Sequence, residues 1–195
     1  MSNALTVCNG ALQKIGEARI MSLGEASKQA RTCNSEYNKT RLSVLRMYNW
    51  SFASKRVILA PDPDPPVFEF SHAFQLPSDY VRVVELFEYE GKYRVEGRQL
   101  LADTDTIYLK YVADVEDFAQ ADPLFIEVLE WQLAYNICRY LTESSTVRQE
   151  AFQGLKAILP MAKFVQSTEH SQPIFEANDL IESRNRGSFV RDPMT

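Results

Sequence analysis

Residues 56–66 have the sequence RVILAPDPDPP, and this stretch divides the chain into parts with different patterns. Four prolines fill six positions, where they remove backbone donors and force extended or turn geometry. Before this stretch the apolar residues recur with the period of a helix, whereas from residue 68 to 112 β-branched and aromatic residues alternate with turn residues. The sequence therefore predicts a helical part that is interrupted by an inserted β part.

Two helices are predicted before the break, over residues 3–15 and 25–48. Gly16 follows the first, at a position where helices often end in a left-handed residue. Arg41 interrupts the apolar stripe of the second helix. Its stem could lie along the edge of the core with the guanidinium in water, or the guanidinium could pair with a buried carboxylate.

Within the β part, strands are predicted at residues 68–76, 81–89, 92–96 and 106–112. Glu90-Gly91 predicts a tight hairpin between the second and third of them. Because an isolated strand pair is marginally stable, three or four strands in a small sheet or sandwich are expected. Four strand tyrosines could serve a binding surface, but alternation places about half of them in the core. They are Tyr89, Tyr93, Tyr108 and Tyr111.

Two more helices are predicted after the β part. Asp122-Pro123 is an N-cap followed by proline at the first helical position, and the helix that follows to residue 141 is apolar on nearly every side, which is typical of a central position. A fourth helix begins near Ser145 and contains Pro160, which is expected to kink it. Residues 167–195 have no sustained period but mix arginines with apolar residues, which indicates either an arm that orders on a neighbouring molecule or a frayed terminus.

We therefore predict an α+β fold, mainly a helical bundle of about four helices, with an inserted small antiparallel β domain and an extended C-terminal arm. The predicted helical domain comprises residues 1–59 and 113–166, the inserted β module residues 60–112, and the arm residues 167–195.

Length and composition exclude several protein classes. The 195 residues suit one domain or one domain with an insertion, and 45% hydrophobic residues are enough to bury a core. No apolar run reaches the roughly 18–20 residues of a membrane helix, and no signal sequence is apparent, so a soluble protein that is not exported by the usual route is expected. The three cysteines are far apart and predict buried free thiols, and two histidines exclude a histidine-rich metal centre.

Charge is unevenly distributed along the chain. Residues 1–60 hold nine Lys/Arg and three Asp/Glu, whereas the remainder holds twelve and twenty-three, and the total is -5. Such a molecule could associate head to tail through surfaces of opposite charge, although two solvated faces without a partner explain the pattern equally well. The negative total charge argues against binding of nucleic acid phosphates.

No common nucleotide-binding, metal-binding or nucleophile motif occurs in the sequence. Neither a catalytic residue nor a cofactor-binding or metal-binding residue is therefore predicted, and we expect no enzyme and no cofactor. Glycoside hydrolysis needs only two carboxylates about 5–9.5 Å apart, so residue types alone leave a hydrolase open. The carboxylate clusters are Asp103/Asp105, Asp114/Glu116/Asp117 and Glu127/Glu130.

An ordered set of residues carries a resemblance to a known family. It runs Ala11-Leu12-x-Lys14-Ile15-Gly16-x-x-x-Ile20-x-Ser22-Leu23, Ala26-x-x-x-Ala30-x-x-Cys33-x-x-x-Tyr37-x-x-x-Arg41-x-x-x-Leu45, Trp50-x-Phe52-Ala53-x-x-Arg56-x-x-Leu59-Ala60 and Phe74-Gln75-Leu76-Pro77-x-Asp79-x-x-Arg82-Val83. Over residues 4–83 the chain resembles tail tubular protein A, the head-to-tail adaptor family of short-tailed (podovirus-like) bacteriophages and prophages.

The resemblance implies a structural virion protein of the tail, made in the host bacterial cytoplasm. It implies a ring, usually a dodecamer, between the portal protein ring and a tail nozzle protein similar to tail tubular protein B, through which DNA passes. The chain would self-associate in that ring and stay monomeric before assembly, without sequence-specific nucleic acid binding or a membrane. The matched Gly16, Tyr37, Arg41, Trp50 and Arg56 would hold the fold together.

Contacts with the portal or with a neighbouring copy are predicted in the arm. The predicted contact residues are Arg184, Arg186, Phe189 and Arg191. The alternatives are a peptidoglycan-degrading tail component of the glycoside hydrolase type and a tail assembly chaperone.

Overall fold

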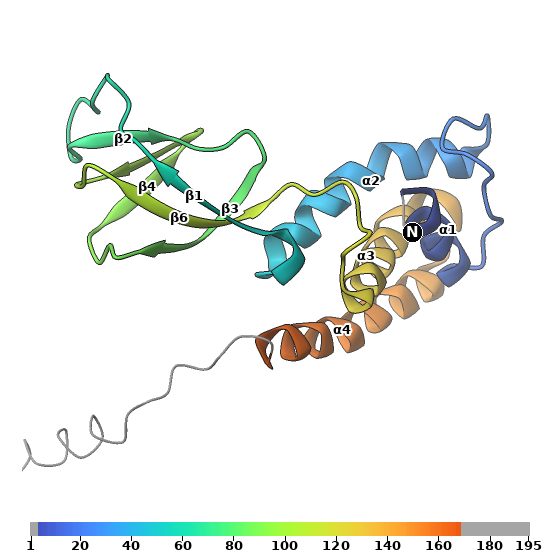
Figure 1. Ribbon diagram of the computed structural model, residues 1–195. Helices are drawn as coiled ribbons and strands as arrows, with labels where there is room; N and C mark the ends of the chain where they lie inside the picture. The colour runs from blue at the N-terminus through green and yellow to red at the C-terminus, as the bar shows by residue number, and fades with distance from the viewer. Residues whose placement is uncertain (1–3, 169–195) are drawn as a thin grey trace, which may run out of the picture.

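The computed structural model describes residues 4–168, which form a helical unit and a β unit placed end to end (Figure 1). The helices are α1 (Ala4–Lys14), α2 (Lys28–Met47), α3 (Pro123–Leu141) and α4 (Ser145–Thr168), with a 3-10 turn η1 (Ser51–Ala53) after α2. The strands are β1 (Ser54–Leu59), β2 (His72–Gln75), β3 (Tyr80–Phe87), β4 (Tyr93–Glu96), β5 (Gln99–Ala102) and β6 (Ile107–Ala113).

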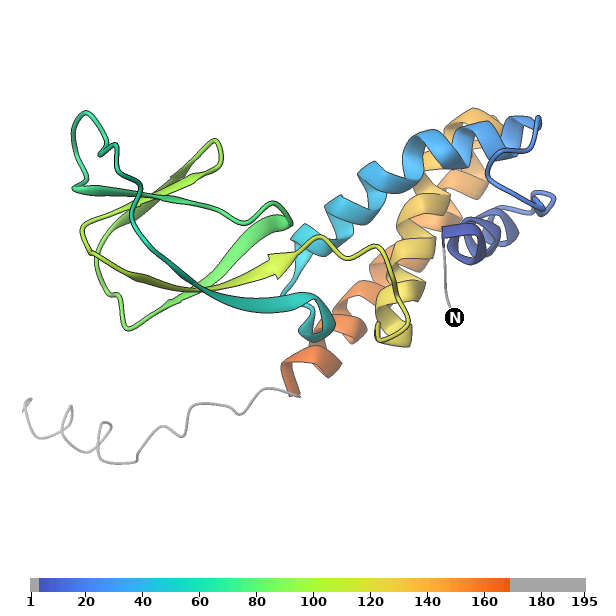
Figure 2. The ribbon, with the colours of Figure 1, turned by 45° about the horizontal axis from the view of Figure 1, so that its top comes forward.

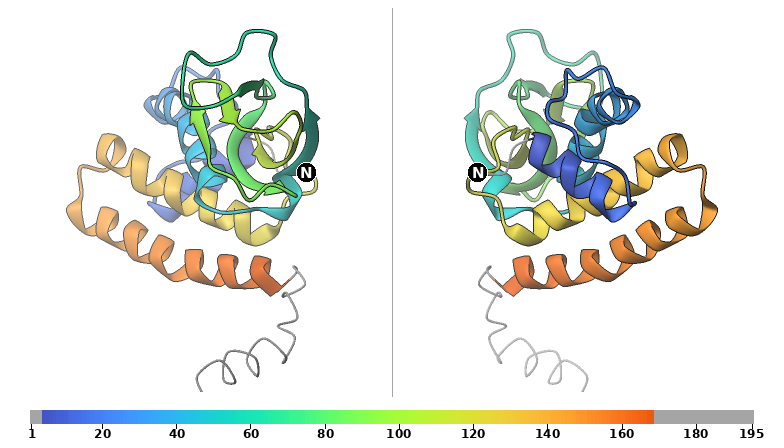
Figure 3. Two further views of the ribbon diagram at one scale, coloured as in Figure 1. Left: turned by 90° about the vertical axis from the view of Figure 1, so that its left-hand side faces the viewer. Right: turned by 90° about the vertical axis from the view of Figure 1, so that its right-hand side faces the viewer.

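Local signals place the four helices close to where the sequence predicts them. The Ser27 hydroxyl caps α2 by accepting a hydrogen bond from the Ala30 amide at 3.1 Å, and Asp122 caps α3 from the Leu124 amide at 2.7 Å. Gly16 has φ 74°, as expected for a residue just beyond a helix end. The apolar α3 packs against α1, α2 and α4, and Figure 3 shows α4 on its outer side. The central position of α3 is thus confirmed.

The expectation of a mainly helical bundle with one small β domain is wrong. Six strands form two three-stranded antiparallel sheets, sheet A in the order β1-β6-β3 and sheet B in the order β2-β5-β4. A core separate from that of the helices fills the space between the two sheets. Sheet A contributes Leu59 and Leu109 to it, and sheet B contributes Phe74 and Leu100. The β unit therefore has its own interior and extends about as far as the helical unit (Figure 2), so the fold is α+β with two cores.

Strand pairing explains why the sequence underestimated the β unit. The predicted hairpin at Glu90-Gly91 is wrong, because β3 pairs with β6 and the chain crosses there from sheet A to sheet B. The hairpin lies instead between β4 and β5, where Gly97 has φ 58°. Strand β5 is a short apolar run that periodicity does not distinguish from a helix. Strand β1 pairs with β6 and so belongs to sheet A, although the predicted boundary at residue 60 assigned it to the helices.

A polar joint links the two units. The Arg41 guanidinium on α2 pairs with the Asp114 carboxylate just after β6 and donates to the Val115 carbonyl at 2.7 Å. Of the two alternatives for Arg41, the structure thus has the pairing with a carboxylate. Farther along α2, Arg46 donates to the Val81 carbonyl of β3 at 2.7 Å. These contacts hold the beginning of β3 and the segment just after β6 against the second half of α2.

A second polar cluster holds the turn before β3. Lys55 of β1 and Tyr111 of β6 donate to the Asp79 carboxylate at 2.6 and 3.0 Å. Burial works to raise the pKa of Asp79, but the two hydrogen bonds and the Lys55 charge outweigh it, so the pKa lies below its usual value. Burial and the bond to Asp79 raise the pKa of Tyr111 to about 12. An ionised Asp79 therefore stabilises this corner of the sheet.

Asp79→Asn is expected to lower the free energy of unfolding by about 1 kcal/mol at neutral pH. Because the pKa of Asp79 is lower in the folded chain than in the unfolded chain, the ionised carboxylate stabilises the fold above about pH 4, and this contribution is lost as the pH falls through the folded pKa. Urea unfolding of both proteins across a pH series measures the difference. The exposed Asp64→Asn serves as control, and a difference for Asp79→Asn that persists unchanged at acid pH would contradict the account.

Candidate interaction surfaces

The predicted carboxylate clusters have structural partners. Asp103 accepts hydrogen bonds from the Ser71 amide and hydroxyl at 2.8 and 3.0 Å, and Asp117 accepts from the Ala119 amide at 3.0 Å. Glu130 forms an ion pair with Lys14 at 3.0 Å. With Asp114 held by Arg41, the carboxylates of Asp103, Asp114 and Glu130 connect segments of the fold, whereas Asp117 holds a local turn. Among residues 4–168 no group of His, Cys, Asp and Glu is arranged to hold a metal ion.

The three cysteines are buried and free, as predicted. Cys8 of α1 faces Cys33 of α2, and the hydrogen bond between the two thiols together with burial raises the pKa of Cys8. Cys8 therefore stays a neutral thiol inside the helical core. No helix in the part of the chain that the structure describes combines the length and apolar character needed to span a membrane.

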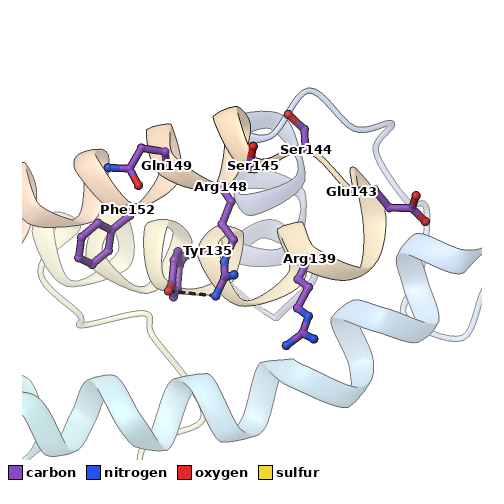
Figure 4. A pocket seen from close by; sticks show the side chains of 8 residues that line it. All are labelled: Tyr135, Arg139, Glu143, Ser144, Ser145, Arg148, Gln149 and Phe152. Atoms are coloured by element: carbon purple, nitrogen blue, oxygen red, sulfur yellow. Dashed lines mark hydrogen bonds between the residues drawn. The ribbon is translucent and has the colours of Figure 1, made fainter.

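A polar hollow of about 600 Å³ lies at the turn between α3 and α4. In Figure 4, Arg148 reaches from α4 to Tyr135 of α3, whereas Arg139 and Glu143 point away from this pair. Arg148 donates to the Tyr135 hydroxyl at 3.1 Å and stacks 4.9 Å from the centre of its ring. The guanidinium is thus engaged with the aromatic ring, and the hollow presents mainly exposed polar groups to solvent.

An apolar hollow of about 570 Å³ lies on the outer face of sheet A. Ile58 of β1, Tyr108 of β6 and Phe87 of β3 form one row across the three strands, since Tyr108 is the register partner of both others. We call this row with its surroundings the sheet A hollow. Arg56, Lys110 and Glu85 form the adjacent row. Arg56, which the resemblance implied holds the fold together, is exposed here instead.

A second apolar feature is the tip of the loop at residues 60–71. Val67 and Phe68 are both exposed there, and we call these two residues the loop tip. Figure 1 shows this loop leading into β2 at the end of the β unit away from the helices. The sequence predicted the loop from its prolines but placed residues 68–71 in a strand, and so missed the tip.

The C-terminal end of α4 carries a third group of exposed apolar side chains, Met161 and Phe164. Gln166 anchors this end, because its side-chain oxygen accepts from the Ser51 amide at 2.9 Å and its nitrogen donates to Asp122 at 2.8 Å. The predicted contact residues Arg184, Arg186, Phe189 and Arg191 lie outside the described residues.

Sequence alternation identified part of these surfaces. Of the four tyrosines, Tyr111 is buried, Tyr89 is half-buried, and Tyr93 and Tyr108 are exposed, as alternation implied. The sequence did not identify Ile58 or Phe87, because their exposure depends on which strands flank β6. Alternation about Tyr108 could have suggested a row, but its neighbours follow from long-range pairing alone.

Comparison with protein-family models found no match, and comparison with curated proteins found none either.

Proposed function

We propose that this chain is a structural tail protein of a short-tailed phage or prophage, a head-to-tail adaptor that forms a ring between portal and tail nozzle. The observation that carries the proposal is the ordered set of matched residues over positions 4–83. The proposed partners are the portal ring, a nozzle protein and further copies of this chain. The proposed location is the virion tail, after synthesis in the host cytoplasm.

The positions of the matched residues support this proposal. Tyr37, Arg41 and Trp50 are buried along α2 and at its end, where the helical unit meets the β unit. Asp79 and Arg82 occupy the facing turn and the start of β3. These residues hold the helical unit and its joint with the β unit, and other matched residues such as Leu12, Ala30 and Cys33 fill the helical core, so the pattern specifies the fold rather than a reaction centre. Function would then reside on the exposed surfaces that the joint orients, consistent with a protein that works by assembly.

The test is the solution mass of the purified protein, alone and after mixing with the portal ring of its own phage, followed by negative-stain imaging. We expect a monomer that adds to the portal as a ring. A portal that binds its other partners but not this protein would overturn the proposal. A wall-clearing assay distinguishes the hydrolase alternative, and protein sequencing of mature virions distinguishes the chaperone alternative.

Truncation after Thr168 is expected to abolish or strongly reduce addition to the portal while the remaining chain folds normally. Residues 4–168 contain both cores and the Gln166 contacts, so residues 169–195 are not expected to be needed for stability. Circular dichroism and the mass of the portal complex provide the two readouts. The full chain with Arg184, Arg186 and Arg191 each replaced by Gln separates loss of charge from loss of length. Unimpaired ring formation by the truncated chain would contradict the assignment of portal contacts to the arm.

A further inference from the structure

The sheet A hollow exposes more apolar surface than an isolated strand residue would. Ile58 is 65%, Phe87 60% and Tyr108 44% exposed, and the register places them side by side. Their strand neighbours Leu59 and Ile107 point the other way and fill the core between the sheets. The inner face therefore supplies the core, and the outer row, although its members pack against one another, stays largely open to solvent in the single chain. Contiguous exposed apolar rows of this kind are typical of interaction sites.

The loop tip is the most exposed apolar pair in the β unit. Val67 is 96% and Phe68 78% exposed. The base of the loop is held, because the Asp62 amide donates to the Ala73 carbonyl at 2.7 Å and Glu69 pairs with Arg94 at 2.9 Å. Proline at positions 61, 63, 65 and 66 restricts the backbone further. The tip is thus presented in a largely preformed conformation, which lowers the entropic cost of binding.

The two surfaces have complementary charge. The 60–71 loop carries three carboxylates, from Asp62, Asp64 and Glu69, and no Lys or Arg. The border of the sheet A hollow carries two cations, Arg56 and Lys110, beside Glu85. Glu69 forms an ion pair with Arg94, and Asp62 accepts a hydrogen bond from the neutral Gln99 side chain, so the loop stays acidic next to its apolar tip. Complementary potentials of this kind set the orientation of an encounter.

The two surfaces lie on opposite layers of the β unit. The loop tip stands beside β2 and shares its surroundings with Arg94, Gln99 and Leu101 of sheet B, whereas the hollow lies on the outer face of sheet A. Each copy therefore offers a projecting apolar tip on one layer and a receiving hollow on the other. Contacts between unlike patches are heterologous, and they propagate head to tail into a ring or a filament.

We propose that a second copy of this chain occupies the sheet A hollow, with its Val67 and Phe68 inserted among Ile58, Phe87 and Tyr108. The acidic loop of one copy then lies against Arg56 and Lys110 of the next. In the proposed ring this contact would be the interface between neighbouring copies, and that role rests on the proposed function. Its test does not, because it uses the purified chain alone.

Cross-linking of full-length chains tests the contact. One protein carries Val67→Cys, which keeps Phe68, and the other carries Ile58→Cys, which keeps Phe87 and Tyr108. The native cysteines are buried and contribute no background. After the two are mixed at the highest soluble concentration and oxidised, we expect mixed dimers in roughly tenfold excess over a control pair of Val67→Cys with Met21→Cys. Met21 is highly exposed but lies in the helical unit.

A chain that carries both Val67→Cys and Ile58→Cys is expected to give a ladder of oligomers. Adding Phe68→Asp to the Val67→Cys chain is expected to remove the excess of mixed dimers over the control pair. Rising salt should reduce the yield of mixed dimers, because Arg56, Asp64 and Glu69 are exposed and salt screens exposed charges. Mixed dimers no more abundant than in the control pair would overturn the proposal, as would preferential cross-linking of Ile58→Cys to a Phe189→Cys chain. If the protein cross-links head to tail but does not bind the portal, the adaptor function alone is rejected. If it binds the portal but does not cross-link, this contact alone is rejected.

Discussion

Asp114→Ala is expected to lower the free energy of unfolding by about 3–5 kcal/mol, because it leaves a buried guanidinium without its carboxylate. Arg41 is only 3% exposed, and its Nε has no hydrogen-bond partner among the described residues. Glu116 lies 3.9 Å from the guanidinium but is mostly exposed, so it offers little compensation. The Val115 carbonyl would remain as the main acceptor.

The reverse substitution should cost less. In Arg41→Met the remaining Asp114 is 32% exposed and can be hydrated, so a loss of about 2 kcal/mol is expected. The double variant, which removes both charges, is expected to be more stable than Asp114→Ala alone. Urea unfolding of all four proteins measures the cycle, and Lys39→Met on the exposed side of α2 is the matched control. If Asp114→Ala cost less than Arg41→Met, the role assigned to the buried guanidinium would be wrong.

Trp50→Ala is expected to cost about 3–5 kcal/mol, since it removes a large side chain from the core of the helical unit. The indole is fully buried and meets the ring of Phe125 edge-on, with 5.0 Å between ring centres. Its Nε1 donates to the Val44 carbonyl at 2.9 Å. The alanine variant would therefore leave a cavity between α2 and α3 and an unpaired carbonyl.

Trp50→Phe separates these two contributions. It keeps most of the apolar volume but loses the hydrogen bond, and a smaller loss of about 1–2 kcal/mol is expected. Unfolding followed by circular dichroism avoids reliance on tryptophan fluorescence, which only Trp131 would then supply. Equal losses for the alanine and phenylalanine variants would show that packing of the indole contributes little.

The helices could be predicted from the sequence because their hydrogen bonds and caps involve residues within four positions of one another. The Asp122-Pro123 start of α3 and the Gly16 end of α1 are signals of this kind. The sequence of a strand contains no comparable local signal that identifies the strand with which it pairs. The crossing of the chain from β3 in sheet A to β4 in sheet B was therefore missed, and a hairpin was predicted in its place.

The candidate surfaces divide in the same way. The proline-rich loop and the alternation that exposes Tyr108 are present in the sequence, and the exposed position of Tyr108 follows from a period of two. Ile58 is 50 positions and Phe87 21 positions away from Tyr108 along the chain. The three become neighbours only because β6 pairs with β1 and with β3.

By itself the sequence determined the helices, the break at residues 56–66 and the buried thiols, whereas the resemblance to a structural tail protein stays a prediction. Tertiary structure decided that the strands form two sheets around their own core, that Arg41 meets a carboxylate 73 residues away, and which apolar side chains are left outside. The physical reason is the range of the interactions, since helix formation and capping are local whereas sheet register, buried ion pairs and surface rows depend on contacts between distant segments.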